Sequence, residues 1–153
     1  MITVASCQPD DPCAIFLLDQ LSDTLAAITG DSGRASFDPR DMDQPQSLFV
    51  VARTDENTAV GCGAYRPLMS GIAELKRMYA APGTTGVGAI ILQHLEKAAT
   101  QDGYTALWLE TRRVNTRAVR FYERHGYTVI PNFGKYFGRC DAVCFAKQLG
   151  SGL

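Results

Sequence analysis

The chain has 153 residues, 46% of them hydrophobic, which fits one domain with an ordinary packed core. Its 15 Lys and Arg residues nearly cancel its 16 Asp and Glu residues, so the net charge of -1 provides no strong field for a nucleic acid or an anionic membrane. No apolar run approaches the roughly 20 residues that span a bilayer, and the first residues lack the pattern of a signal peptide. We therefore expect a cytoplasmic protein with no nucleic-acid or membrane partner, in which residues 1–150 form one domain and 151–153 a C-terminal tail.

The first half of the chain predicts a strand, a helix, a loop and three strands. Residues 1–6 alternate as a strand, and 9–28 begin with Pro and Asp and then carry apolar residues at helical spacing. This predicted helical face consists of Ile15, Leu18, Leu21, Leu25 and Ile28. The polar, turn-rich segment 30–46 is long enough for a functional loop that could cover a substrate site.

Three β-prone runs then follow, separated by short turns. They occupy residues 47–54, 59–68 and 72–80, and the turn signals between them favour an antiparallel meander. The last of these strands leads directly into a glycine-rich turn.

The second half predicts two more helices and three more strands. A helix begins at Gly86, and its predicted apolar face consists of Ile90, Ile91, Leu92, Leu95 and Ala98. A strand over 105–111, a helix over 115–126 and strands over 127–130 and 141–149 follow. This alternation predicts a mixed α/β sheet with helices on its faces, and a cofactor crevice where the strand before the glycines turns into the helix.

The glycine turn predicts an anion site. Gly83, Gly86 and Gly88 stand within six residues, and glycine permits positive φ and close approach at an entropic cost. The amides of residues 84–89 have no partner in the helix that they begin, so they can donate to phosphate oxygens, helped by the helix dipole. An ordinary helix start is the alternative. The lysine and hydroxyl of a mononucleotide P-loop are missing, and the dinucleotide pattern fits poorly.

A metal site is not expected. There are only two histidines, and the five cysteines form no Cys-x-x-Cys pair, so free thiols that act as small apolar groups are the favoured interpretation. The cysteines are Cys7, Cys13, Cys62, Cys140 and Cys144.

The order "AELKRMYAAP", glycine turn, amphipathic helix, "LWLET", "NTRAVRFYERHGY" resembles the GNAT superfamily of acetyl-CoA-dependent N-acetyltransferases. The likeness runs from the first strand to about Leu149. The family's motif is Arg or Gln, x, x, Gly, x, then Gly or Ala. The turn meets it at Gly86 and Gly88 but carries Gly83 where the side chain is expected, in a loop about two residues shorter than usual.

The resemblance implies a mostly antiparallel central sheet flanked by helices, with a splayed strand pair at the cofactor site. It implies acetyl-CoA as cofactor, with CoA as product, held by the splayed strand, the glycine turn and the helix predicted over 115–126. The implied cofactor-binding residues are Met78, Tyr79, Ala80, Gly83, Thr84, Thr85, Gly86, Val87, Gly88, Ala89, Asn115, Ala118, Phe121 and Tyr122. Backbone groups near Met78 and Ala80 would polarise the acetyl carbonyl. The Thr84 and Thr85 hydroxyls are candidates to compensate for the missing side chain, and the alternative is that both are ordinary turn residues.

The resemblance also implies two proton-handling residues. Tyr122 occupies the place of the tyrosine that donates to the departing sulfur, and Glu74 that of a carboxylate that accepts the amine proton, often through water. For Glu74 the alternative is a strand-surface charge paired with Lys76 or Arg77, and for Tyr122 a packing aromatic. Asn115 matches an asparagine near the cofactor arm, and it is also a good N-cap.

The acceptor is expected to be the amine of a small metabolite. Arg34, Arg66 and Arg77 flank the expected substrate side, where guanidinium donors would suit a carboxylate, although each is also a candidate surface residue. The segment from Pro131 resembles a loop of a bacterial subgroup with small-molecule acceptors, in which Phe133 and Tyr136 would wall the acceptor site.

Two other functions stay open from the sequence. One is a non-catalytic acyl-CoA sensor or partner module, favoured by the irregular glycine turn, and the other is an α/β interaction domain without CoA. Many relatives in the family form dimers, so a homodimer is a candidate assembly.

Overall fold

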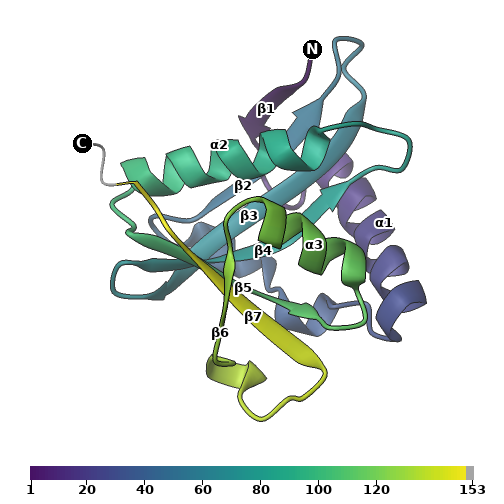
Figure 1. Ribbon diagram of the computed structural model, residues 1–153. Helices are drawn as coiled ribbons and strands as arrows, with labels where there is room; N and C mark the ends of the chain where they lie inside the picture. Colours follow the sequence, from purple (N-terminus) through teal and green to yellow (C-terminus); the bar gives the residue numbers. More distant parts are fainter. Residues whose placement is uncertain (151–153) are drawn as a thin grey trace.

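The computed structural model describes residues 1–150, and its seven strands form one sheet in the order β1-β2-β3-β4-β5-β7-β6 (Figure 1). The strands are β1 Thr3–Ser6, β2 Leu48–Arg53, β3 Ala59–Met69, β4 Ile72–Ala80, β5 Ala106–Arg112, β6 Thr128–Ile130 and β7 Ala142–Gln148. Every neighbouring pair is antiparallel except β4 and β5, which are parallel. The predicted mixed, mostly antiparallel sheet is confirmed. The tail predicted at 151–153 lies outside the described residues.

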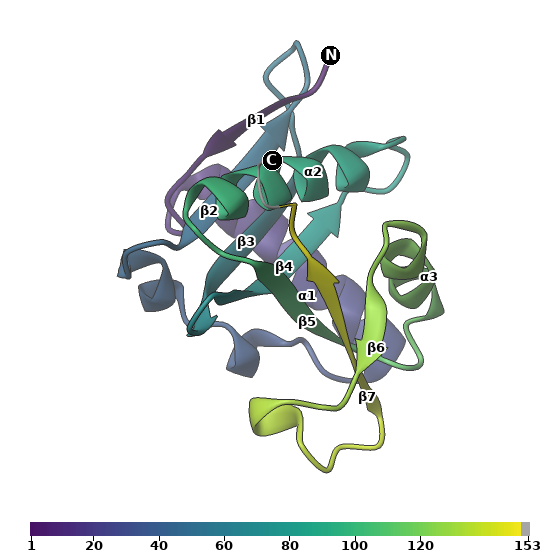
Figure 2. The ribbon, with the colours of Figure 1, turned by 60° about the vertical axis from the view of Figure 1, so that its left-hand side comes forward.

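Helices cover both faces of this sheet. The helices are α1 Pro12–Thr29, α2 Val87–Gln101 and α3 Thr116–Arg124, with short 3-10 helices η1 Arg34–Ser36, η2 Pro39–Asp43 and η3 Gly134–Tyr136. Helices α2 and α3 lie on one face and α1 on the other (Figures 1 and 2). Within residues 1–150, no single helix has the length and apolarity needed to cross a membrane.

The apolar face predicted for α1 is partly wrong. Ile15 and Ile28 are 46% and 40% exposed. The buried positions are Ala14, Leu17, Leu21 and Ser22. Asp11 caps the helix by accepting a hydrogen bond from the Cys13 amide at 2.9 Å, and from this start the stripe that meets the sheet passes through positions 14, 17 and 21. On α2, Ile90 likewise lies outside the buried stripe, at 38% exposed.

Three apolar clusters hold the layers together. The largest lies between α2 and the sheet and includes Ile91, Leu95 and Phe145. A second lies beneath α1, and a third lies beneath η3, where Phe133 contacts the Trp108 ring at 5.2 Å between centroids. The third cluster places the loop after β6 against the middle of the sheet.

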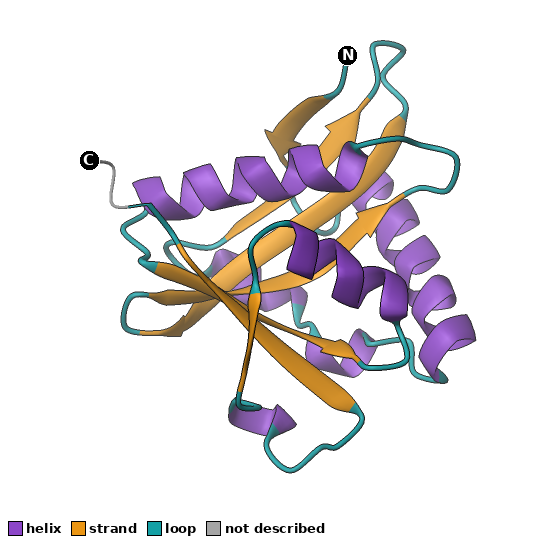
Figure 3. Cartoon of the chain, in the orientation of Figure 1, coloured by secondary structure: helices purple, strands orange, loops and turns teal. Residues whose placement is uncertain are grey.

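Strands β4 and β5 separate after three residue pairs. Their ladder ends at the pair Glu74 and Trp108, and beyond this point the two strands diverge (Figure 3). Opposite β3, Ala64 pairs with Lys76 but Cys62 pairs with Tyr79, so β4 carries one extra residue. Arg77 lies in this bulge with a φ of 54°, and a bulge of this kind bends the strand and increases its twist. The splayed strand pair that the resemblance implies is therefore present, and we call the part of the sheet where the two strands diverge the β4–β5 opening.

Candidate active site

The glycine turn lies at the end of β4, directly before α2. Gly83 and Gly86 have φ values of 82° and 75°, in the left-handed region that favours glycine. A Cβ atom at either position would meet no other atom within 4 Å, so the outer side of the turn is open. The turn is therefore a backbone surface that another molecule can approach.

The amides of this turn are free donors. In residues 1–150, no amide from Thr85 to Ala89 donates a hydrogen bond, and the first bond of α2 runs from the Ile90 amide to the Gly86 oxygen at 3.1 Å. Thr84 differs from the prediction, because its amide and its hydroxyl both donate to the Ala81 oxygen, at 3.4 Å and 2.6 Å. The free donors therefore begin at Thr85, and the Thr84 hydroxyl proton is already used.

Helix α3 borders the turn. Asn115 caps the helix by accepting a hydrogen bond from the Ala118 amide at 3.3 Å, which confirms the predicted N-cap. Phe121 touches the start of α2, since a Cβ atom added to Gly88 would lie 3.3 Å from its ring. This contact explains why a residue without a side chain stands at position 88.

Tyr122 is buried beside this contact, at 7% exposed. Its ring packs edge-on against Tyr127, with centroids 5.5 Å apart, and within the described residues its hydroxyl makes no hydrogen bond. Burial raises the pKa of Tyr122, so the hydroxyl keeps its proton at neutral pH. The residue therefore holds a proton that it can donate.

Beyond Glu74, strand β4 offers backbone rather than side chains. The ladder with β5 has ended, so among residues 1–150 no strand lies along one edge of β4 from Leu75 to Ala80. The Met78 side chain packs toward α2, where its sulfur would lie 2.6 Å from a Cβ atom on Gly63. The Tyr79 side chain lies on the α1 side, with its hydroxyl 3.3 Å from Gln20 Oε1. The backbone edge is thus what these residues present to the opening.

A buried ionic cluster lies on the α1 face of β4. The Glu74 carboxylate, in a residue that is 1% exposed, accepts hydrogen bonds from Arg66 Nη2 at 2.9 Å and from the Tyr136 hydroxyl at 2.9 Å. Lys76 Nζ lies 3.5 Å from the same carboxylate and donates to the Tyr136 oxygen at 3.1 Å. Both Glu74 and Tyr136, which the sequence predicts for the site, are therefore joined in one network.

Burial shifts the pKa values in this cluster. It lowers the pKa of Lys76 to about 8, and the Glu74 carboxylate opposes that shift. It raises the pKa of Tyr136, and the neighbouring carboxylate of Glu74 adds to the effect because it favours the neutral phenol. The cluster therefore contains one carboxylate, one guanidinium, one neutral phenol and an amine that titrates close to neutral pH.

Strand β5 contributes a second carboxylate. Glu110 and Trp108 alternate with Leu107 and Leu109, so they lie on the same face as the ionic cluster while the leucines join the main core. Glu110 pairs with Arg112, and Arg112 also lies 3.3 Å from Asp31. Neither Lys76 nor Glu110 belongs to the predicted site. Alternation within the two strands, together with charged residues in otherwise apolar runs, is the signal that could have identified both.

Two of the three arginines predicted to bind the acceptor, Arg77 and Arg34, already have partners on or near α1. Arg77 is 9% exposed, and it donates to the Leu18 oxygen at 3.3 Å, to the Ser32 oxygen at 3.3 Å and to the Ser22 hydroxyl. Arg34 is exposed and pairs with Asp19 at 3.1 Å. The bulge turns Arg77 toward α1, so we do not retain these two arginines as acceptor residues.

The loops after α1 and β6 meet over this face. Lys135 Nζ donates to the Ser36 oxygen at 3.5 Å, and Arg66 lies 3.4 Å from Asp41 on η2. Phe133 and Tyr136 are both buried, with ring centroids 5.3 Å apart in an edge-on contact. The segment predicted to cover a substrate site and the predicted aromatic wall therefore lie together, on the side of the sheet opposite α2.

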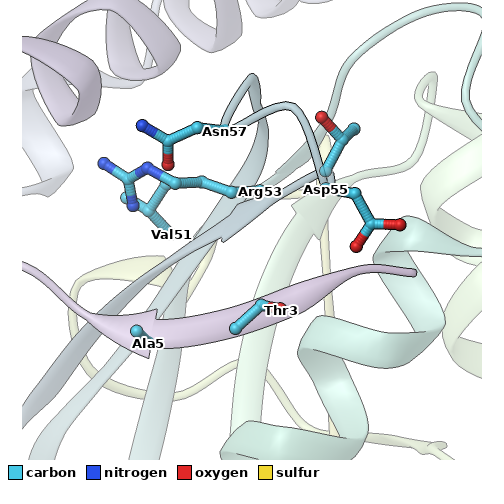
Figure 4. A pocket seen from close by; sticks show the side chains of 7 residues that line it. Thr3, Ala5, Val51, Arg53, Asp55 and Asn57 are labelled. Atoms are coloured by element: carbon cyan, nitrogen blue, oxygen red, sulfur yellow. The ribbon is translucent and has the colours of Figure 1, made fainter.

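Shallow hollows occur elsewhere on the surface. The one in Figure 4 lies where β1 meets β2 and is lined by Thr3, Val51, Arg53, Asp55 and Asn57. It is at the edge of the sheet, where β1 is three positions and β2 two positions away from β4 in the order of the sheet. It contains none of the residues of the β4–β5 opening, so we do not assign the site to it.

Comparison with known proteins identifies the family of this chain. The model of the acetyltransferase (GNAT) family matches residues 16–127. An "IAA acetyltransferase" of Azospirillum brasilense is 29% identical over 138 residues, covering 88% of this chain and 90% of that protein.

Solved structures share the fold. A Klebsiella pneumoniae protein proposed to be an acyl-CoA N-acyltransferase superposes with a TM-score of 0.83 at 27% identity, covering 98% of this chain and 99% of its own. A GNAT family acetyltransferase of Elizabethkingia anophelis with acetyl-CoA bound gives a TM-score of 0.70 at 16% identity, covering 97% of this chain and 98% of its own.

Proposed function

The chain belongs to the GNAT family of acetyltransferases, and we propose that it transfers the acetyl group of acetyl-CoA to the amine of a small molecule. The observation that carries this proposal is the free backbone edge of β4 leading into a turn whose amides, from Thr85 to Ala89, have no partner within the described residues. A thioester arm can lie along such an edge while its phosphates meet the amides.

The turn offers a pyrophosphate group hydrogen-bond donors from its backbone amides rather than from side chains. Five consecutive free amides at the start of a helix provide directed donors and the positive end of the helix dipole. The open Cβ positions at Gly83 and Gly86 leave room for a phosphate group to approach. Residues Gly83 to Gly88, Asn115, Ala118 and Phe121 would hold the cofactor, which supplies an activated acetyl group as a thioester.

The residues of this chain have distinct roles in the proposal. Backbone amides of Met78 or Ala80 at the free edge of β4 stabilise negative charge on the acetyl oxygen, where loss of one such donor typically costs about 3 kcal/mol. Tyr122, which stays protonated at neutral pH, donates a proton to the departing sulfur. Phe133, Tyr136 and Arg66 wall the acceptor side of the opening.

The test is release of free thiol from acetyl-CoA with a panel of small amines. We expect thiol release above the rate of hydrolysis only with suitable acceptors, and an acetylated product of matching mass. Hydrolysis that no amine accelerates would argue against transfer. A cytoplasmic location and a homodimer stay predictions.

A second function is favoured by one feature of the turn. Gly83 stands where the family's Arg or Gln side chain is expected, and no Lys or Arg occurs from Ala80 to Glu96. A non-catalytic acyl-CoA sensor would bind CoA compounds and release no thiol with any amine. Calorimetry and thiol release on the same preparation therefore separate the two functions.

A further inference from the structure

The Glu74 carboxylate has donors on both of its oxygens. Arg66 Nη2 lies 2.9 Å from Oε1, and the Tyr136 hydroxyl lies 2.9 Å from Oε2, with Lys76 Nζ 3.5 Å from that same atom. The residue is 1% exposed. An amine could reach this carboxylate only by displacing partners that β3, β4 and η3 hold in place, so Glu74 is suited to positioning its neighbours rather than to taking a proton from an acceptor.

A second carboxylate lies across the β4–β5 opening. The ladder of β4 and β5 ends at the pair Glu74 and Trp108, and two residues further along β5 stands Glu110. Side chains alternate along a strand, so Glu110 lies on the same face as Trp108, next to the aromatic wall. Its counterpart on β4, two residues beyond Glu74, is Lys76.

One oxygen of Glu110 is unoccupied. Oε2 accepts from Arg112 Nη1, whereas Oε1 has no hydrogen-bond partner within residues 1–150. In the described chain, the fully buried side-chain nitrogen and oxygen atoms that lack a hydrogen-bond partner are Arg66 Nε and Arg77 Nε. Glu110 Oε1 is not one of them, so this oxygen is not fully buried. The Glu110 side chain is 10% exposed, so Oε1 is a free acceptor that another molecule can reach.

The surroundings of Glu110 adjust its proton affinity. Burial raises the pKa of Glu110, while Arg112 on β5, Lys76 on β4 and Arg139 in the loop after η3 oppose that rise. Asp31 and Asp141 share Arg112 with Glu110. A carboxylate whose pKa is closer to neutral is a better base at neutral pH than an ordinary surface carboxylate.

We propose that Glu110 Oε1 takes the proton from the ammonium group of the acceptor, and that Glu74 is a positioning residue for Lys76 and Tyr136. The step breaks an N–H bond of the ammonium and forms an O–H bond on Glu110, which leaves the nitrogen lone pair free to attack the acetyl carbon. Glu110 then returns the proton to solvent. The attack forms the N–C bond and the C–S bond of the thioester then breaks. Tyr122 gives its proton to the departing sulfur, and the second proton that the nitrogen loses in becoming an amide restores the Tyr122 hydroxyl. This proposal rests on the proposed acetyl transfer.

The test compares Glu110→Gln, Glu74→Gln and the surface control Glu56→Gln. Rates of thiol release are measured against pH, with the best amine of the panel and with hydroxylamine, a nucleophile that is already uncharged near neutral pH. Calorimetry gives the dissociation constant of acetyl-CoA for each variant. Arg112 keeps Asp31 and Asp141 as partners in Glu110→Gln, so the fold is expected to survive.

We expect Glu110→Gln to lower kcat/KM for the amine by about 10² to 10⁴ fold near neutral pH, and to move the acid limb of its pH profile up to the pKa of the amine itself, because only the uncharged amine can then react. Hydroxylamine should react at close to the wild-type rate, and the acetyl-CoA dissociation constant should change less than about twofold. Glu110→Asp, which keeps a carboxylate, should keep an acid limb whose midpoint lies below the pKa of the amine. Glu74→Gln should raise KM and keep the acid limb, and Glu56→Gln should match wild type.

An acid limb that keeps its wild-type midpoint in Glu110→Gln and moves to the pKa of the amine in Glu74→Gln would overturn this assignment while leaving acetyl transfer intact. A wild-type protein that binds acetyl-CoA but releases no thiol with any amine would instead contradict the proposed function.

Discussion

The hydroxyl of Tyr136 donates a hydrogen bond to the buried carboxylate of Glu74 at 2.9 Å, although 62 residues separate the two in the sequence. This bond joins the loop after β6 to the strand that carries the proposed chemistry. The same hydroxyl accepts a hydrogen bond from Lys76, so one phenol connects an anion and a cation inside the protein.

Tyr136→Phe should destabilise the protein by about 1–3 kcal/mol, because it removes one hydrogen-bond partner from the buried Glu74 carboxylate and one from the buried Lys76 amine. Chemical denaturation measures the change. The control is Phe137→Leu, at a neighbouring position that is 82% exposed, where we expect almost no change. Equal stability of Tyr136→Phe and wild type would show that the hydrogen bonds of this hydroxyl to Glu74 and Lys76 do not stabilise the protein.

Arg77→Met should lower the free energy of unfolding by about 2 kcal/mol, since the guanidinium holds α1 and the loop after it against the bulge in β4. Arg34→Met is the matched control, because its ion pair with Asp19 is exposed and such pairs contribute about 0–1 kcal/mol. Chemical denaturation of both variants gives the two changes in the free energy of unfolding. A larger loss in Arg34→Met than in Arg77→Met would contradict the buried placement of Arg77.

Gly86→Ala and Gly103→Ala form a pair that separates strain from binding. Both glycines have positive φ, 75° and 95°, and a Cβ atom at either would meet nothing within 4 Å. Each substitution should therefore cost about 1–2 kcal/mol of stability. Calorimetry should show weaker acetyl-CoA binding in Gly86→Ala alone, because the added methyl group narrows the approach to the free amides. Equal acetyl-CoA affinity in the two variants would contradict the binding of a phosphate group at this turn.

Tyr122→Phe should lower kcat by about 10² to 10⁴ fold and leave acetyl-CoA affinity nearly unchanged, because the ring stays in its packing site and only the proton is lost. Stability should also hold, since the hydroxyl has no partner within the described chain. Steady-state kinetics and calorimetry check the two parts, and a parallel loss of rate and affinity would rule out the acid role.

Lys76 should make stability depend on pH in alkaline solution. Burial lowers its pKa to about 8 in the folded protein, whereas the unfolded chain keeps the ordinary value of about 10.4. Between these values the unfolded state binds more protons, so the free energy of unfolding should rise with pH. Denaturation of wild type, Lys76→Met and the exposed control Lys97→Met across this window tests the sign. The rise should be absent in Lys76→Met alone, and an identical rise in all three proteins would place its cause elsewhere.

Local patterns were sufficient to predict the elements and their order. The strand predicted over 72–80 coincides with β4, and Asn115 is the N-cap of α3 as expected, because alternation and capping depend on neighbouring residues. The resemblance added the splayed strands, which no periodicity reveals. The phase of α1 was missed, since spacing alone does not tell which of two overlapping apolar stripes meets the sheet.

Contacts between distant residues could not be predicted. The direction of Arg77 depends on a one-residue bulge, and the donors around Glu74 come from β3 and from a loop about 60 residues away. The same holds for the free oxygen of Glu110, which is defined by where β4 and β5 separate rather than by any motif.

Thermal unfolding with and without ligand tests the central claim most directly, by comparing acetyl-CoA and CoA with ATP. A ligand that binds only the folded protein adds about 2.7 kcal/mol of stability at 100 times its dissociation constant. The account predicts a clear rise in Tm with both CoA compounds and none with ATP, and a smaller rise in Gly86→Ala. No rise with acetyl-CoA or CoA would contradict the assignment of the glycine turn and the β4–β5 opening as an acetyl-CoA site.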